Sequence, residues 1–307
     1  MPRSRRPAGE GRLLQLVYYG YVAGSALARA LPERWVYGLA NALGSIAARR
    51  SKRRWLVETH LARITGLPRD SNELQDKVVE AFCSYARYWL ETFRLVRENR
   101  EFFLERFGSV GNDNLNAALA LGRGAIVVVG HLGNWDAAGA WVGATDRRLV
   151  AVAEVLRPRR MFEFFAEHRS RLGMTIYGAE PGITSKLVTE VQNGAVLAIV
   201  GDRDLRGNGV EMDFFGEPAT FPRGPANIAL RSGVPLMVAG VYELFLPDGR
   251  RGWMCDISEP LEPPDEGEGA VEVFTQRIAA KLEEYVARHP EQWHVFQPFW
   301  LSERKEA

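Results

Sequence analysis

One histidine in the sequence is spaced from an aspartate in a way that suits proton transfer. His131 and Asp136 lie in the stretch GHLGNWD at residues 130–136, directly after the apolar run at 125–129. On an unbroken helix, residues five positions apart are rotated by about 140°, so the two side chains would not share a face. If His131 lies in a strand-to-helix loop and Asp136 lies in the first helical turn, the two side chains can converge.

A carboxylate beside one imidazole nitrogen would make His131 a general base. The carboxylate fixes the tautomer and stabilises the imidazolium that forms when the ring takes up a proton. The other nitrogen can then deprotonate a hydroxyl, which the substrate must supply as the nucleophile. Gly130 and Gly133 give the loop backbone freedom, and Asn134 is a suitable N-cap for the helix. The alternative is a loop histidine that hydrogen-bonds a nearby cap.

A second group of charged residues follows another apolar run. Asp202, Arg203 and Asp204 come directly after residues 195–200. In parallel sheets, ligands bind beyond the carboxyl ends of the strands, so this position favours a functional role. A solvated turn with a local ion pair is the alternative.

A third candidate site precedes a predicted helix. Arg223 lies in the stretch FPRGP at residues 221–225. The arginine and the N–H groups of the helix start could bind a phosphate. A simple helix-starting turn with Pro225 at the first position explains the stretch equally well. The remaining histidines are interpreted as structural; they are His60, His168, His289 and His294.

Several chemistries are excluded by motifs that the sequence lacks. It contains no Gly-x-Ser-x-Gly elbow of an α/β-hydrolase, no Gly-x4-Gly-Lys of a P-loop enzyme and no His-Glu-x2-His zinc motif. The two cysteines, Cys83 and Cys255, are far apart in the sequence. This spacing excludes a disulfide framework and a multi-thiolate metal site.

The pattern of apolar residues predicts the elements that must hold these side chains. The first hundred residues follow helical spacing, and Asp70-Ser71 is a plausible N-cap for a helix that extends to about Val96. From about residue 123, short apolar strands alternate with helices. The predicted strands are 125–129, 149–153, 174–177, 196–200, 211–214, 235–242 and 253–257, and the predicted helices are 135–144, 160–172, 184–193, 225–231 and 271–288. This alternation predicts an α/β fold with a mostly parallel central sheet flanked by helices.

The 307 residues of the chain are expected to form a single domain, 1–307.

The charge of the chain is distributed unevenly. Residues 1–55 carry eleven Lys or Arg and two acidic residues, a net charge of +9, so the other residues carry −8 of the overall +1. A basic section on an acidic body predicts an anionic partner surface.

The basic section also holds an apolar run with three tyrosines, at residues 13–28. This run is shorter than the ~20 residues of a membrane-spanning helix. A helix that lies in the membrane interface fits better, with tyrosines at headgroup depth. A buried helix with a solvated basic tail is the alternative. Nucleic-acid binding is not expected, because the apolar strands do not present an exposed sheet of aromatic and basic residues.

We therefore predict a membrane-facing helical section, 1–55, and a catalytic body, 56–307. The non-enzyme alternative is a peripheral membrane-binding protein. That alternative leaves the pair of His131 and Asp136 without a role.

Residues 130–136 resemble the His-x4-Asp signature of the glycerolipid acyltransferase superfamily. More narrowly, the chain resembles the lipid A biosynthesis (lauroyl/myristoyl) acyltransferases and their actinobacterial relatives, the phosphatidylinositol mannoside acyltransferases. Further stretches agree in order: SYARYW at 84–89, VAE at 152–154, DRDL at 202–205, DFFG at 213–216 and the closing residues 293–300. The resemblance covers about residues 12–301.

The resemblance implies transfer of a fatty acyl chain from acyl-CoA or acyl carrier protein to a hydroxyl of a membrane glycolipid. It implies a phosphatidylinositol mannoside as acceptor, with a lipid A precursor or a lysophospholipid as alternatives. The reaction would take place at the cytoplasmic face of the cell membrane, with the enzyme bound peripherally or embedded through its N-terminus. We expect no metal and no cofactor, because the thioester is itself a substrate.

The resemblance also implies roles for single residues. His131 becomes the base and Asp136 the residue that orients it. Glu154 and Arg169 match positions of the active-site groove, although Arg169 could instead pair with a carboxylate such as Glu154. Asp202 matches an acidic position that the mannoside acyltransferases fill with glutamate.

Overall fold

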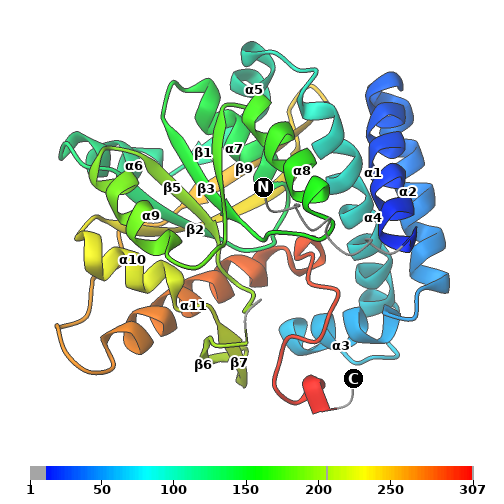
Figure 1. Cartoon of the computed structure of the whole chain (residues 1–307). Helices are drawn as coiled ribbons and strands as arrows, with labels where there is room; N and C mark the ends of the chain where they lie inside the picture. Colours follow the sequence, from blue (N-terminus) through cyan, green and yellow to red (C-terminus); the bar gives the residue numbers. More distant parts are fainter. Residues whose placement is uncertain (1–11, 205–206, 306–307) are drawn as a thin grey trace, which may run out of the picture.

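The computed structural model describes residues 12–204 and 207–305, which form helices on both faces of a central sheet (Figure 1). The sheet has seven strands in the order β1-β9-β8-β2-β5-β3-β4. They are β1 (Phe107–Val110), β2 (Ala125–Val129), β3 (Leu149–Ala153), β4 (Met174–Gly178), β5 (Val196–Val200), β8 (Leu236–Phe245) and β9 (Arg251–Ile257). Every neighbouring pair is parallel except β8 and β9. The prediction of a mostly parallel sheet is confirmed.

The helices divide between the two faces of the sheet and an N-terminal group. In the described residues they are α1 (Arg12–Ala30), α2 (Glu33–Arg50), α3 (Arg54–Thr65), α4 (Asn72–Leu95), α5 (Arg100–Arg106), α6 (Asn112–Ala120), α7 (Trp135–Ala144), α8 (Arg159–Arg171), α9 (Ile183–Gln192), α10 (Gly224–Ser232) and α11 (Ala270–Arg288). The apolar side chains of α9, α10 and α11 pack on one face of the sheet. Those of α5, α6 and α7 pack on the other face.

The strand β2 shows why the chemistry must lie at the ends of the strands. All five of its residues are buried. Because side chains alternate along a strand, Ile126 and Val128 pack with α9–α11, whereas Val127 and Val129 pack with α7. A charged side chain on this strand would be buried on either face, so polar residues can begin only after Val129.

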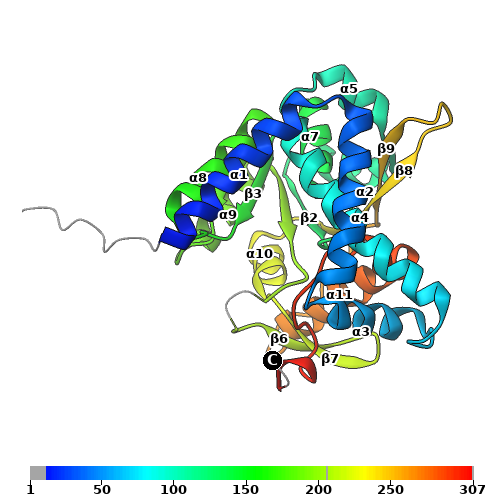
Figure 2. The same cartoon turned by 90° about the vertical axis from the view of Figure 1, so that its right-hand side faces the viewer.

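Helices α1, α2 and α3 pack against the long helix α4 (Figure 2). The predicted start of α4 is confirmed, because Ser71 caps it and accepts a hydrogen bond from the backbone N of Leu74 at 3.2 Å. Within the described residues, no helix has both the length and the apolar character needed to cross a bilayer. Three of the eleven basic residues in the predicted membrane-facing section 1–55, namely Arg3, Arg5 and Arg6, lie outside the described residues.

One predicted strand does not belong to the central sheet. Residues 211–214 lie in β6 (Val210–Phe214), which pairs with β7 (Glu217–Phe221) as a separate antiparallel hairpin. The side chains of β6 alternate between buried and exposed, which is typical of a hairpin with one solvated face and not of a doubly covered strand. The pattern of apolar residues also does not predict β1, β7, α5 or α6.

Candidate active site

The predicted base lies in the loop between β2 and α7. Gly133 turns this loop with a φ of +58°, and a Cβ atom there would lie 2.2 Å from the carbonyl oxygen of Val241. The turn therefore requires glycine. Asn134 caps α7 as predicted, since its Oδ1 accepts a hydrogen bond from the backbone N of Ala137 at 3.0 Å.

The carboxylate of Asp202 holds the imidazole of His131 in place. Oδ1 of Asp202 lies 2.6 Å from Nδ1 of His131, and Oδ2 accepts hydrogen bonds from the backbone N of His131 at 2.7 Å and from Nε1 of Trp293 at 2.9 Å. Burial raises the pKa of Asp202, but His131 and these hydrogen bonds lower it by more, so the pKa lies below the ordinary value. The ionised carboxylate binds the proton on Nδ1, which leaves Nε2 as the free nitrogen.

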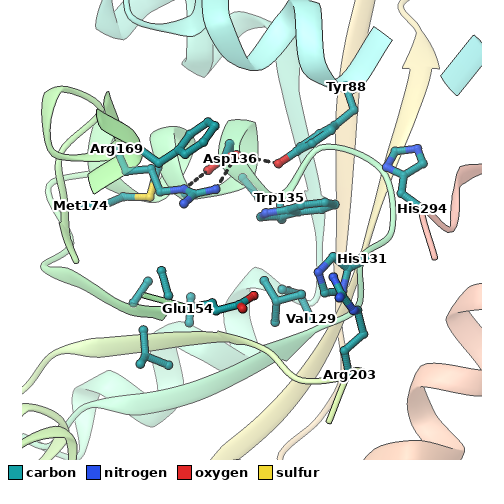
Figure 3. Close-up of a pocket in the computed structure, with 18 of the residues that line it drawn as sticks. Tyr88, Val129, His131, Trp135, Asp136, Glu154, Arg169, Met174, Arg203 and His294 are labelled. Atoms are coloured by element: carbon teal, nitrogen blue, oxygen red, sulfur yellow. Dashed lines mark hydrogen bonds and ion pairs between the residues drawn. The ribbon is translucent and has the colours of Figure 1, made fainter. Parts of the chain in front are cut away.

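The expected hydrogen bond between His131 and Asp136 is wrong. The carboxylate of Asp136, in the first turn of α7, instead binds Arg169 of α8 and Tyr88 of α4 (Figure 3). The distances are 2.6 Å from Nε of Arg169 to Oδ1, 3.2 Å from Nη2 of Arg169 to Oδ2, and 3.0 Å from the Tyr88 hydroxyl to Oδ2. Arg169 thus pairs with Asp136 and not with Glu154. A catalytic role for Asp136 remains a prediction.

The pair of Asp136 and Arg169 stays charged although both residues are largely buried. Burial raises the pKa of Asp136, but Arg169, His168 and Tyr88 lower it by more, so the pKa lies below the ordinary value. Burial lowers the pKa of Arg169, but Asp136 outweighs this and raises it. The pair therefore ties α7 to α8 beside the base.

A segment near the end of the chain completes the site. The backbone N of His294 donates a hydrogen bond to the carbonyl oxygen of His131 at 2.7 Å, and the backbone N of Gly133 donates to the carbonyl oxygen of Gln292 at 2.9 Å. The sequence alone suggests a structural role for His294, but its side chain lines the same cavity as that of His131. In the sequence, only the family resemblance of residues 293–300 points to this segment, and it does not indicate that His294 lies in the site.

A buried glutamate of α4, Glu91, hydrogen-bonds the residue that ends the loop. Oε2 of Glu91 accepts hydrogen bonds from Nδ2 of Asn134 at 2.9 Å and from Nε1 of Trp253 at 3.2 Å. Burial raises the pKa of Glu91, and these bonds only partly offset that rise. The sequence gives no local signal for Glu91, because its partners lie 43 and 162 positions away in the chain.

An apolar cavity of about 600 Å³ opens beside His131. It lies between α7 and the sheet, and α4 and α8 contribute to its walls (Figure 3). His131, Glu154 and Arg203 line it near the carboxyl ends of the strands. The lining from Val200 back to Val196 on β5 is apolar and about 13 Å long, given the rise of an extended strand.

Small side chains leave this space open. Ala151 and Ala198, in the middle of β3 and β5, line the cavity on the α7 face. On the opposite face, the neighbouring residue Leu197 fills the core. Above the strands, a Cβ atom on Gly139 of α7 would lie 2.6 Å from Sδ of Met174 in the cavity wall. Larger residues at these three small positions would fill the cavity.

The structure places the other predicted residues as follows. Glu154 is exposed after the end of β3, and Arg203 is half-buried after β5; both line the cavity. Asp204 accepts hydrogen bonds from the backbone N atoms of Gly207 and Gly209. Arg223 is not among the residues that line the cavity; it pairs with Glu272 at 2.9 Å and lies at the start of α10. A phosphate contact for Arg223 remains a prediction.

The arrangement can deprotonate a hydroxyl that lies beside the head of a long apolar ligand in the cavity. His131 is 18% exposed at the side chain, and no hydrogen bond from the described residues engages its Nε2. In the same part of the chain, no group of three or more His, Cys, Asp or Glu is placed to hold a metal ion.

Comparison with known proteins identifies similar chains over nearly the full length. The model of the bacterial lipid A biosynthesis acyltransferase family matches residues 7–302. A phosphatidylinositol mannoside acyltransferase of Mycolicibacterium smegmatis is 34% identical over 292 residues, which covers 94% of this chain and 93% of the relative. A protein of the same description from Mycobacterium tuberculosis H37Rv is 35% identical over 295 residues, covering 94% and 90%.

Replacing Asp202 by asparagine should impair the base without unfolding the protein. Oδ2 accepts two N–H donors, so the asparagine carbonyl must take that position and its NH₂ group must face Nδ1 of His131. The imidazole is then forced to carry its proton on Nε2, where the base must be free. We expect kcat to fall by roughly 10²–10⁴-fold, measured by steady-state kinetics beside a thermal unfolding curve. Near-normal turnover by folded Asp202→Asn would contradict this orientation.

The pair of Asp136 and Arg169 should make stability depend on pH in a defined window. Because the folded pKa of Asp136 is lowered, its stabilisation is complete above the unfolded pKa of about 3.9 and is lost as the pH falls through the folded value. Asp136→Asn should lower the free energy of unfolding by about 3 kcal/mol or more at neutral pH, and this difference should shrink in acid. Urea unfolding measures it, with exposed Asp265→Asn as control. A difference that stays constant in acid would refute the ionised pair.

Proposed function

The chain belongs to the bacterial lipid A biosynthesis acyltransferase family, and on that premise we propose that it acylates a sugar hydroxyl of a phosphatidylinositol mannoside, with a long-chain acyl thioester as donor. The chain is an acyltransferase. The observation that carries the proposed chemistry is the His131 imidazole, bound by Asp202 at one nitrogen and placed beside an apolar cavity. The proposed acceptor rests on the two mycobacterial relatives.

The apolar cavity is proposed to hold the acyl chain of the donor. Burying a methylene group contributes about 0.8 kcal/mol to binding. The apolar lining along the strands β2, β3 and β5 would therefore supply most of the binding free energy of a long chain. The thioester then lies at the carboxyl ends of these strands, where His131 and Arg203 line the cavity. We take acyl-CoA as the donor, and acyl carrier protein offers the same thioester.

The proposed reaction is direct transfer. Nε2 of His131 takes the proton of the sugar hydroxyl while the oxygen attacks the thioester carbonyl, and Asp202 stabilises the imidazolium that forms. The tetrahedral intermediate collapses when the C–S bond breaks. The imidazolium returns its proton to the thiolate, so an ester and a thiol are the products and the base is regenerated.

The test of this function is transfer to a defined acceptor. Purified protein should release thiol from long-chain acyl-CoA when phosphatidylinositol mannoside is present, and mass analysis should find one added acyl ester on the glycolipid. His131→Ala should lose roughly 10²–10⁴-fold in turnover, because no other group takes the hydroxyl proton.

Two results would contradict the proposal. One is transfer to a lipid A precursor or a lysophospholipid, with none to the mannoside. The other is an acyl group bound covalently to Cys83 or Cys255, because direct transfer has no acyl-enzyme intermediate.

We further propose that the enzyme binds the cytoplasmic face of the cell membrane peripherally through α1, α2 and the turn that follows. These helices expose large apolar side chains, namely Leu14, Leu16, Val17, Tyr19, Leu27, Trp35, Leu43 and Ile46. Arg49, Arg50 and Lys52 are exposed beside them, and the neighbouring Arg53 lines the cavity. An anionic leaflet attracts each such charge by about 1 kcal/mol. The membrane surface would thus lie near the entrance to the active site.

Neutralising three charges should weaken this binding. Arg49, Arg50 and Lys52 are replaced together by Gln, whereas Arg53 and Arg54 stay because they donate hydrogen bonds to the carbonyl oxygens of Phe296 and Ala48. Binding to anionic vesicles should fall and lose most of its dependence on salt, as measured by co-sedimentation. Activity on detergent-dispersed acceptor should persist.

The matched control replaces three basic residues on α10 and α11, which lie on the other side of the molecule (Figure 1). These residues are Arg231, Arg277 and Lys281, and because they donate hydrogen bonds to Ser185, Glu262 and Glu284, a thermal unfolding curve must first show that the control is folded. The control has the same change in net charge and should keep its vesicle binding. Equal loss in both variants would show that net charge alone attracts the protein to the vesicles.

A further inference from the structure

We propose that His294 is a second catalytic residue, whose Nδ1–H donates a hydrogen bond to the carbonyl oxygen of the donor thioester and stabilises the negative charge that develops there. The inference rests on the proposed acyl transfer. It assigns an electrophilic group to a reaction for which His131 supplies only the base.

The first observation is the position of His294. Its backbone N binds the carbonyl oxygen of His131 at 2.7 Å, so the two histidines lie on adjoining, directly bonded segments. Both rings line the same cavity, and His294 lies near Trp135 and Tyr88 with ring centroids 6.2 Å and 5.5 Å away (Figure 3). A carbonyl placed for attack beside His131 is therefore close to His294.

The second observation is a buried polar atom without a partner. His294 is 6% exposed, and within the described residues its Nδ1 has no hydrogen-bond partner. Its other nitrogen, Nε2, lies 2.9 Å from Oγ of Ser84. Buried polar atoms are nearly always satisfied, and the cavity that His294 lines is the space beside it that a ligand would fill, so we infer that a ligand atom supplies the partner of Nδ1.

The hydroxyl of Ser84 determines which nitrogen of His294 carries the proton. Ser84 is 3% exposed, and the hydrogen bond shown for its hydroxyl is the one to Nε2 of His294. A buried O–H group must donate, so Ser84 donates and Nε2 accepts. The ring proton of the neutral imidazole is then on Nδ1, and Nδ1 is a donor that can bind a carbonyl oxygen.

The surroundings of His294 keep the ring neutral. Burial, His131 and Arg87 lower its pKa to about 3. The ring therefore neither competes with His131 as a base nor gives up its proton during the reaction. A neutral imidazole can still act as an electrophile, as it does in triosephosphate isomerase. The bond to the oxygen strengthens as the carbonyl becomes an oxyanion and weakens again when the C–S bond breaks.

Variants of His294 can separate this role from packing. His294→Gln places its amide where Nε2 was, so it can keep the bond to Ser84 and leaves no donor at the position of Nδ1. His294→Asn places an amide N–H at the position of Nδ1. We expect kcat to fall by roughly 10²–10³-fold in His294→Gln and in His294→Ala, with a smaller loss in His294→Asn. The KM for acyl-CoA and the pH profile of kcat should change little.

A vibrational measurement tests the bond itself. With acyl-CoA labelled at the thioester carbonyl and no acceptor present, the carbonyl stretch of the bound donor should lie at lower frequency in the wild type than in His294→Gln. His289, whose side chain is 45% exposed, precedes the same segment and does not line the cavity, so His289→Gln is the control and should match the wild type.

The outcomes distinguish this inference from the proposed function. If the wild type turns over acyl-CoA and His294→Gln matches it in kcat and in carbonyl frequency, the inference is overturned and the function stands. If the wild type neither binds nor processes the thioester, the proposed function fails and the inference fails with it. The donor role is supported if folded His294→Gln has a low kcat, its bound carbonyl stretches at a higher frequency than in the wild type, and His294→Asn remains active.

Discussion

Three N–H groups from two distant parts of the chain converge on the carboxylate of Asp202 at the end of β5. Two belong to His131 and one to Trp293. A carboxylate that is 1% exposed is tolerated only when it is paired and hydrogen-bonded, so the fold must bring both His131 and Trp293 to it. The adjacency of β2 and β5 in the sheet delivers His131, and the segment after α11 delivers Trp293. The orientation of the base therefore depends on both the sheet order and the closing segment.

The second carboxylate of the site, that of Asp136, has a different role. Asp136 binds Arg169 and Tyr88, which joins α7 to α8 and α4 around the cavity. A cavity that holds an acyl chain should present few uncompensated charges, because each would cost free energy against an apolar ligand. Pairing Asp136 with Arg169 meets that requirement beside the entrance. Small residues such as Ala198 meet the other requirement, which is space.

Local features of the fold were predictable from the sequence, whereas pairings between distant residues were not. The cap at Ser71 and the turn at Gly133 follow from neighbouring residues, and both were confirmed. The choice of Asp136 as partner of His131 was wrong, because spacing in a loop does not show where a helix directs its first side chain. Asp202 lies 71 positions from His131, and only the strand order brings them together. The position of Asp202 after a buried strand was the available signal in the sequence. It predicted that Asp202 binds the substrate, whereas in the structure Asp202 orients His131.

The tautomer of His131 is the property that tests most directly whether Asp202, and not Asp136, orients the base. It is read from the nitrogen chemical shifts of an isotope-labelled protein at a pH where the imidazole is neutral. The wild type and Asp136→Asn should both carry the proton on Nδ1, whereas Asp202→Asn should carry it on Nε2. A proton that moves to Nε2 in Asp136→Asn, and stays on Nδ1 in Asp202→Asn, would contradict the assignment.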